Sequence, residues 1–190
     1  MQRKYQQHLQ WCNEQKNEII IRNIPIDYTE NDVKRQFLIY GNILKVIIKV
    51  LGTWKQAHVF FKDAKTVKDN FIDNWLDFIE KDGVRIYLAD NYENNMNQRS
   101  QFCSKLCNLP KNTTAYDLEG YIRLVNGKTC FIPRARKIYN RLRYAYVNFE
   151  SQEDLERFSM TLYLYTSRIF KFIGSNLKPK HATFVNQILT

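Results

Sequence analysis

Glycine, histidine and cysteine are scarce in this sequence of 190 residues, which contains 6 glycines, 3 histidines and 4 cysteines. It has no Gly-rich phosphate-binding loop and no His-Glu-x-x-His run, so two common arrangements for nucleotide-driven chemistry and metal-assisted hydrolysis are missing. We therefore expect no catalytic residues, no cofactor and no enzymatic activity.

The four cysteines do not have the paired Cys-x-x-Cys spacing of a zinc site. They are Cys12, Cys103, Cys107 and Cys130, and the histidines that could complete a ligand set are scattered along the chain. We predict no metal site and free thiols that behave as small apolar side chains.

Long apolar runs are also missing. The most apolar stretch is residues 43–51, which Lys45 and Lys49 interrupt. It is far shorter than the roughly 20 apolar residues that a membrane-spanning helix needs, and the first residues lack the apolar core of a secretion signal. We expect no membrane association and an intracellular, reducing location, with nucleus and cytoplasm both open.

Positive charge, by contrast, is abundant, with a formal net charge of +10. Residues 1–90 hold 14 Lys and Arg against 12 Asp and Glu, whereas residues 91–190 hold 15 against 7. A basic protein favours polyanionic partners such as nucleic acid. The distribution predicts that such a partner binds the second half of the chain.

An internal repeat sets the domain organisation. Residues 22–25 (Arg-Asn-Ile-Pro) are echoed by residues 107–110 (Cys-Asn-Leu-Pro), at an offset of 85 residues. Residues 57–61 (Ala-His-Val-Phe-Phe) are echoed by residues 145–149 (Ala-Tyr-Val-Asn-Phe), at an offset of 88. Two copies of one fold explain both echoes.

Hydrophobic periodicity and capping residues divide each copy into elements. In the first copy, Thr29 and Asp32 have the spacing of a capping box and Gly41 is expected to end the helix that follows. The predicted elements are strands at residues 18–24, 42–50, 54–61 and 84–89, that first helix, a second helix from Asp63 through Phe78, and a turn at residues 82–83.

The second copy repeats this order, with capping boxes that begin at Thr114 and Ser151 and a first helix that ends at Gly127. Its predicted strands are residues 104–109, 128–133, 142–149 and 168–173. The order predicts an α+β fold of two tandem ferredoxin-like βαββαβ domains, each with two helices on one face of a four-stranded antiparallel sheet. The predicted domains are 17–90 and 102–175, joined by a polar linker at 91–101 and followed by a basic tail at 176–190. An N-terminal extension at 1–16 can form a short helix.

The element order and the third-strand sequence together resemble the RNA recognition motif (RRM) family, over about residues 17–90 and 102–175. That family carries Lys/Arg-Gly-aromatic-Gly/Ala-aromatic-Val-x-aromatic in the third strand. Residues 142–149 read Leu-Arg-Tyr-Ala-Tyr-Val-Asn-Phe and agree at six of these eight positions. Leu142 and Arg143 depart from the pattern, although Arg141 stands one residue from the expected basic position.

The resemblance implies that the second domain stacks bases of single-stranded RNA on Tyr144 and Tyr146. Alternate side chains of a strand point to opposite faces, so these two rings are expected on the open face while Ala145, Val147 and Phe149 pack under the helices. Lys105 stands where the family places a third stacking aromatic and can still meet a phosphate or a base edge. The alternative is that the tyrosines only favour the strand, or that the tail or the other domain covers them.

A dense basic segment separates the two predicted strands of this hairpin. It contains five cations in ten residues and no acid, and we predict that it contacts RNA phosphates rather than serving solubility alone. The cations are Arg134, Arg136, Lys137, Arg141 and Arg143. Lys178, Lys180 and His181 of the tail can extend the same track.

The first domain departs further from the family pattern. Gln56 and His58 occupy the two stacking positions, and Ile20 stands where a first-strand aromatic is expected. Trp54, His58 and Arg22 are secondary candidates for RNA contact, against a packing or protein-binding role for this domain.

We therefore predict an RNA-binding protein whose second domain stacks bases and contacts phosphates. The alternative is an RRM-like protein-protein interaction module with little or no intrinsic RNA binding, in which another protein binds through the first domain. The sequence does not separate RNA from single-stranded DNA, and it gives neither an RNA sequence preference nor an oligomeric state.

Overall fold

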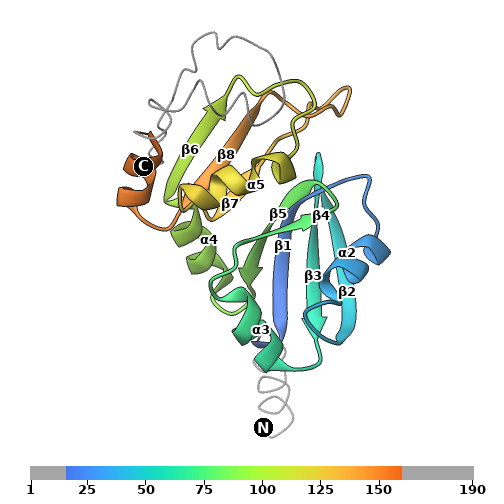
Figure 1. Cartoon of the computed structure of the whole chain (residues 1–190). Coiled ribbons are helices and arrows are strands. Elements are labelled where there is room, and N and C mark those ends of the chain that lie inside the picture. The colour runs from blue at the N-terminus through green and yellow to red at the C-terminus, as the bar shows by residue number, and fades with distance from the viewer. Residues whose placement is uncertain (1–15, 160–190) are drawn as a thin grey trace, which may run out of the picture. The chain divides into compact units, whose positions relative to one another are not determined.

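The computed structural model describes residues 16–159, which divide into two compact units (Figure 1). Among these residues, the first unit comprises 16–79 and 84–96, and the second comprises 80–83 and 97–159. Residues 1–15 of the predicted N-terminal extension, the last predicted strand and the basic tail lie outside the described residues and stay predictions.

The first unit is built around an antiparallel sheet of five strands, in the order β2-β3-β1-β5-β4. The first helix begins at its predicted start, and β3 has the predicted bounds. The elements are β1 (Glu18–Pro25), α2 (Glu30–Phe37), β2 (Ile43–Leu51), β3 (Trp54–Phe61), α3 (Ala64–Phe71), β4 (Leu76–Ile79) and β5 (Asp82–Leu88).

The core of this unit lies between the sheet and the two helices. Ile21 of β1 is paired with Ala57 of β3 on one side and with Ile86 of β5 on the other, and all three are fully buried. Phe37 of α2 and Phe71 of α3 belong to the same buried cluster. Alternation along the strands therefore sends one set of side chains to the helices and leaves the other set on the opposite face.

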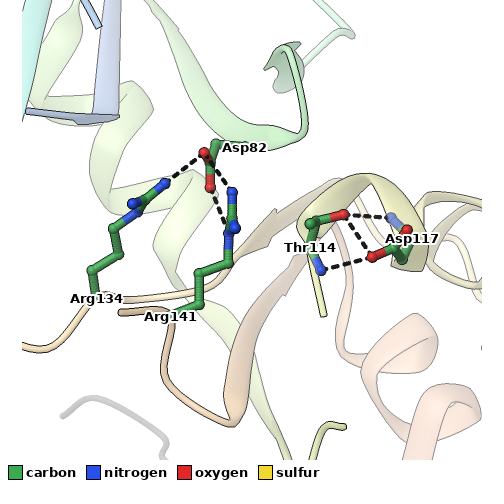
Figure 2. A network of polar contacts seen from close by, with 5 residues as sticks. All are labelled: Asp82, Thr114, Asp117, Arg134 and Arg141. Atoms are coloured by element: carbon green, nitrogen blue, oxygen red, sulfur yellow. Dashed lines mark hydrogen bonds and ion pairs between the residues drawn. The ribbon is translucent and has the colours of Figure 1, made fainter. Parts of the chain in front are cut away.

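The predicted capping boxes are confirmed at two helix starts. The Thr29 hydroxyl accepts from the Asp32 amide at 3.3 Å, and the Thr29 amide donates to the Asp32 carboxylate at 2.8 Å. The same pair of bonds joins Thr114 and Asp117, at 3.2 and 2.8 Å (Figure 2). Each box satisfies amide groups that the first turn of a helix leaves without partners.

Two predicted boundaries in the first unit are wrong. The helix α2 ends at Phe37, before Gly41, which instead permits a close approach because a Cβ there would lie 2.9 Å from Thr66 Cγ2. The helix predicted through Phe78 ends at Phe71, and residues 76–79 form the additional edge strand β4. The Trp75 carbonyl accepts from the Ile86 amide at 2.9 Å, so pairing with β5 replaced the helix that the apolar spacing favoured.

The turn between β4 and β5 lies at residues 80–81 rather than at the predicted 82–83. Glu80 has a φ of 55°, in the left-handed region that a tight turn requires. Asp82 is consequently the first residue of β5 rather than a turn residue.

The predicted linker is a helix, α4 (Tyr92–Ser100), and the boundary between the units falls inside it, after Met96. The helix has little apolar periodicity because most of its side chains are polar. Two of its side chains, Tyr92 and Met96, contact the rest of the first unit. Tyr92 lies edge-on to Tyr87 with ring centroids 5.7 Å apart, and the Met96 sulfur lies 2.8 Å from a guanidinium nitrogen of Arg22.

The second unit repeats the β-α-β-β-α order of the first. Its described strands form a sheet in the order β6-β8-β7, and Phe149 packs on Phe158 with ring centroids 5.0 Å apart. No helix of the described residues is long and apolar enough to span a membrane. The elements are β6 (Phe102–Cys107), α5 (Ala115–Leu124), β7 (Thr129–Phe131), β8 (Tyr144–Phe149) and a helix over residues 152–159.

Candidate nucleic-acid interface

Side chains of β8 alternate between a buried face and an open one. Ala145, Val147 and Phe149 are fully buried, whereas Tyr144 and Tyr146 are partly exposed. The two tyrosines therefore lie on the face of the sheet that the helices do not cover.

Lys105 of β6 lies on the same face, because it is paired with Tyr146 across the two antiparallel strands. Its ammonium group is 4.0 Å from the centroid of the Tyr144 ring and 6.0 Å from that of Tyr146. The two rings are 5.5 Å apart and nearly perpendicular, at 81°. A cation thus covers one ring where the RRM pattern has a third aromatic, which is a favourable cation-π arrangement.

The Tyr144 phenol is in its neutral form at neutral pH. Burial raises its pKa above the ordinary value, and Tyr146 and Cys107 raise that pKa further. The hydroxyl therefore brings no negative charge that would repel phosphate, and it keeps a proton with which to donate a hydrogen bond.

A third ring on this face was missed by the sequence analysis. Phe131 of β7 is paired directly with Tyr146 and is partly exposed, while its neighbour Cys130 is fully buried. The register of β7 against β8 places the Phe131 ring beside Tyr146. Alternation along residues 129–131 could have indicated the face on which the ring lies, but not its neighbour. Among the described strands β6, β7 and β8, the open face therefore carries Phe131, Tyr144 and Tyr146 beside Lys105.

The far end of this face is closed to ligands. Thr129 and Asn148 are paired across β7 and β8, and each is only 2% exposed. The Thr129 hydroxyl donates to Oδ1 of Asn148 at 2.7 Å, and it accepts from the backbone amide of Asn148 at 3.3 Å. Among the described residues of this face, the partly exposed side chains thus include Phe131, Tyr144, Tyr146 and Lys105, whereas Thr129 and Asn148 are buried.

The basic segment between β7 and β8 is an ordered hairpin loop. Arg134 and Arg141 form a β-bridge at its base, and the Leu142 amide donates to the Pro133 carbonyl at 2.8 Å. The Ala135 amide donates to the Asn140 carbonyl at 2.9 Å, which leaves residues 136–138 as the turn. We call residues 134–143 the basic loop.

Two of the five predicted phosphate contacts are held by a carboxylate. Asp82 accepts from Arg134 at 2.8 Å and from two nitrogens of Arg141 at 3.1 and 2.9 Å (Figure 2). Asp82 is the first residue of β5, and the segment 80–83 that contains it is grouped with the second unit, whereas the rest of β5 belongs to the first. The sequence offered no sign of this contact, because Asp82 is more than 50 residues from the loop.

The other three cations of the basic loop are exposed. Arg136 and Lys137 lie at the turn, and neither forms an ion pair with another residue of the described range 16–159. Arg143, next to Tyr144, donates from Nε to the Leu109 carbonyl at 2.8 Å. The exposed charge of the loop is therefore at its tip and beside the aromatic rings.

The corresponding face of the first unit is engaged in contacts of its own. His58 is 2.5 Å from Glu18 through Nδ1 and 3.0 Å from Gln56 through Nε2, so both ring nitrogens have partners. The Arg22 guanidinium lies 4.7 Å from the centroid of Trp54. The three secondary candidates for RNA contact are thus occupied by neighbours within the unit.

The helix α4 contacts a further part of this face of the first unit. Tyr87 is paired with Ile20, and these residues are only 3% and 6% exposed although they lie on the face away from α2 and α3. Tyr92 of α4 packs on Tyr87, and burial raises the pKa of Tyr92. Tyr87 and Ile20 are therefore buried on the face of the first sheet that α2 and α3 do not cover.

The thiols take no part in a ligand cluster within the described residues. Cys130 is buried, Cys103 and Cys107 are partly exposed, and all three are thiols rather than members of a disulfide. No group of three or more Cys, His, Asp or Glu in this part of the chain is arranged to hold a metal ion. Cys12 lies outside the described range.

No family model and no curated protein matches the chain. Among solved structures, the RRM3 domain of Mip6 is 25% identical, with 39% of this chain and 93% of that domain covered and a TM-score of 0.34. The first two RRM domains of the yeast poly(U) binding protein Pub1 are 18% identical, with 76% and 89% covered and a TM-score of 0.32. Sex-lethal RNA recognition domains 1 and 2 from Drosophila melanogaster are 16% identical, with 77% and 93% covered and a TM-score of 0.35.

With TM-scores of this size, the fold assignment rests on the strand order and register of the chain itself. The fold is α+β, with antiparallel sheets backed by helices, as predicted. The first sheet has five strands instead of the four expected. In element order, strand arrangement and third-strand sequence, the chain resembles tandem proteins of the RNA recognition motif family.

Proposed function

We propose that the second unit binds single-stranded RNA, with bases stacked on the open face of its sheet and phosphates held by the basic loop. The observation that carries this proposal is the group of partly exposed rings, Tyr144, Tyr146 and Phe131, on the two strands that the loop connects. Flat rings on a rigid strand suit unstacked bases, which single strands offer and duplexes do not.

Phosphate binding is assigned to the exposed cations near these rings. Arg136 and Lys137 lie at the loop tip, Arg143 precedes Tyr144, and Lys105 lies over the Tyr144 ring. Of the five loop cations predicted from sequence, we retain Arg136, Lys137 and Arg143 for direct contact. The other two, Arg134 and Arg141, are already held by Asp82. Cations that neutralise phosphates release condensed counterions, so the binding should weaken as salt rises.

The test is the affinity for short single-stranded RNA of a Tyr144→Ala, Tyr146→Ala protein. Stacking on an aromatic ring contributes about 1–3 kcal/mol per base, so the loss of two rings should weaken binding at least about 10-fold. Tyr116→Ala is the matched control, because Tyr116 is 55% exposed on α5 and lies outside the sheet face. Equal affinities of the double variant and the wild-type protein would refute the stacking platform.

A second candidate function, protein binding through the first unit, is favoured by its edge strand. β2 is at the end of the sheet order, and Leu44, Ile47 and Val50 are 65%, 42% and 64% exposed along it. An edge strand with exposed apolar side chains can accept another chain. Absence of RNA binding by the wild-type protein at low salt would favour this function over the first.

A further inference from the structure

The cations of the basic loop differ in their surroundings. Arg134 and Arg141, at the base, have side chains that are 17% and 25% exposed, and the Asp82 side chain between them is 8% exposed. Arg136 and Lys137, at the turn, are exposed. The loop therefore has an inner pair of cations beside a carboxylate and an outer pair facing solvent.

We infer that Asp82 sets how many phosphates the basic loop can engage, because it occupies the inner pair, cancels one of its two positive charges and leaves the outer pair for RNA. This inference rests on the proposed function, and it names a residue that stands far from the loop in sequence. Asp82 acts through the arginines rather than on RNA, so its role is to position them and to reduce their net charge.

The geometry of the contact makes the inner pair a poor phosphate ligand. Arg141 binds both oxygens of the Asp82 carboxylate in bidentate fashion, and Arg134 shares one of them. Charge-assisted and bidentate bonds of this kind are among the stronger hydrogen bonds in proteins. An RNA phosphate would have to displace an internal anion that is already in place, whereas at Arg136 and Lys137 it displaces only water and counterions.

Asp82 is also fixed by its own segment. The Tyr116 amide, in the first turn of α5, donates to the carbonyl of Lys81 at 3.3 Å. The β-bridge between Arg134 and Arg141 fixes the other side of the contact. Backbone contacts therefore lie next to the ion pair on both sides, at Lys81 and at the bridge between Arg134 and Arg141.

The salt dependence of RNA binding separates the two pairs. For single strands, the slope of log affinity against log salt changes by about 0.7 for each phosphate neutralised. Arg136→Gln and Lys137→Gln should therefore each reduce the slope by about 0.7. Arg134→Gln and Arg141→Gln should each reduce the slope by less, because Asp82 already occupies both guanidinium groups and cancels one of their two charges.

The experiment measures the affinity of the full chain and of these four single variants for one short single-stranded RNA over a range of NaCl concentrations. Equal slope reductions in all four variants would overturn the division into two pairs. Failure of the wild-type protein to bind RNA would instead overturn the proposed function, and the inference with it. The two failures are therefore distinguishable.

Asp82→Asn is the reciprocal variant. It removes one negative charge from the inner pair, so the slope should steepen by as much as about 0.7 and binding at low salt should strengthen. Loss of the carboxylate also leaves partly buried arginines without their counterion, which can destabilise the fold. Circular dichroism melting monitors this, and if the variant does not fold, the four charge-to-amide variants above still decide the question. A folded Asp82→Asn protein with an unchanged or shallower slope would contradict the inference.

Discussion

The third strands of the two units are alike on one face and different on the other. In β3, Ala57, Val59 and Phe61 are fully buried, and in β8 the buried residues are Ala145, Val147 and Phe149. The outward positions of β3 hold Gln56 and His58, bonded to each other, whereas those of β8 hold two tyrosines. Packing under the helices restricts the inward side chains to apolar shapes, while the outward ones are set by what the face has to contact.

The largest expected effect tests the shared half of this comparison. Phe61→Ala and Phe149→Ala each remove a fully buried ring that packs on a neighbouring helix, at centroid distances of 5.7 Å to Phe71 and 5.0 Å to Phe158. Each should lower the free energy of unfolding by about 3–5 kcal/mol, measured by urea denaturation. A cost well under 1 kcal/mol in either unit would show that the two cores are not equivalent.

The next effect tests the half that differs. Phe131 is opposite Tyr146 in the second unit, and Ile47 is opposite His58 at the corresponding position of the first. Phe131→Ala should weaken single-stranded RNA binding by about 1–3 kcal/mol if a base stacks on the ring. Ile47→Ala, the matched control, should leave the affinity unchanged in the same titration, and equal losses in both variants would break the comparison.

His58 should matter for stability and not for RNA. Its ring is bonded to Glu18, which is only 9% exposed, so His58→Ala leaves a nearly buried carboxylate without this partner. The expected cost is about 1–3 kcal/mol in the free energy of unfolding, with RNA affinity retained. A variant of normal stability that had lost RNA affinity would instead assign His58 to the interface.

The smallest effect compares the starts of the second helices. Ser151 accepts from the Asp154 amide at 3.2 Å, whereas Asp63 at the start of α3 makes no capping bond through its side chain. Ser151→Ala should therefore lower the free energy of unfolding by about 1 kcal/mol, and Asp63→Ala should lower it by less than about 0.5 kcal/mol. Thermal unfolding measures both. Similar costs in the two units would contradict this difference.

The same helix start should be sensitive to acid. Hydrogen bonds from Asn126 and from Ser151 lower the pKa of Asp154 below its ordinary value. A carboxyl with a lowered folded-state pKa contributes stability above its unfolded pKa and loses that contribution as the pH falls through the folded one. In Asp154→Asn, the loss of stability on acidification should therefore be smaller than in the wild-type protein.

Sequence periodicity predicted most elements but failed where tertiary pairing competed with local preference. Phe71, Trp75 and Phe78 have helical spacing, yet the backbone of Trp75 pairs with β5 and the helix ends at Phe71. In the polar segment at 91–101, the contacts of Tyr92 and Met96 are too few to produce a periodic signal, so the helix α4 was missed. Both errors occurred where the deciding partner is distant in sequence or consists of few residues.

For the candidate site, the sequence by itself determined which strand carries Tyr144 and Tyr146, which face they share and where the basic charge is concentrated. Those features follow from alternation and composition, which are local properties of the chain. Only the tertiary structure decided that Phe131 joins the rings, that Lys105 covers one of them and that Asp82 pairs with Arg134 and Arg141. Strand register and long-range ion pairs depend on how segments far apart in sequence come together, and no short stretch of the chain carries that information.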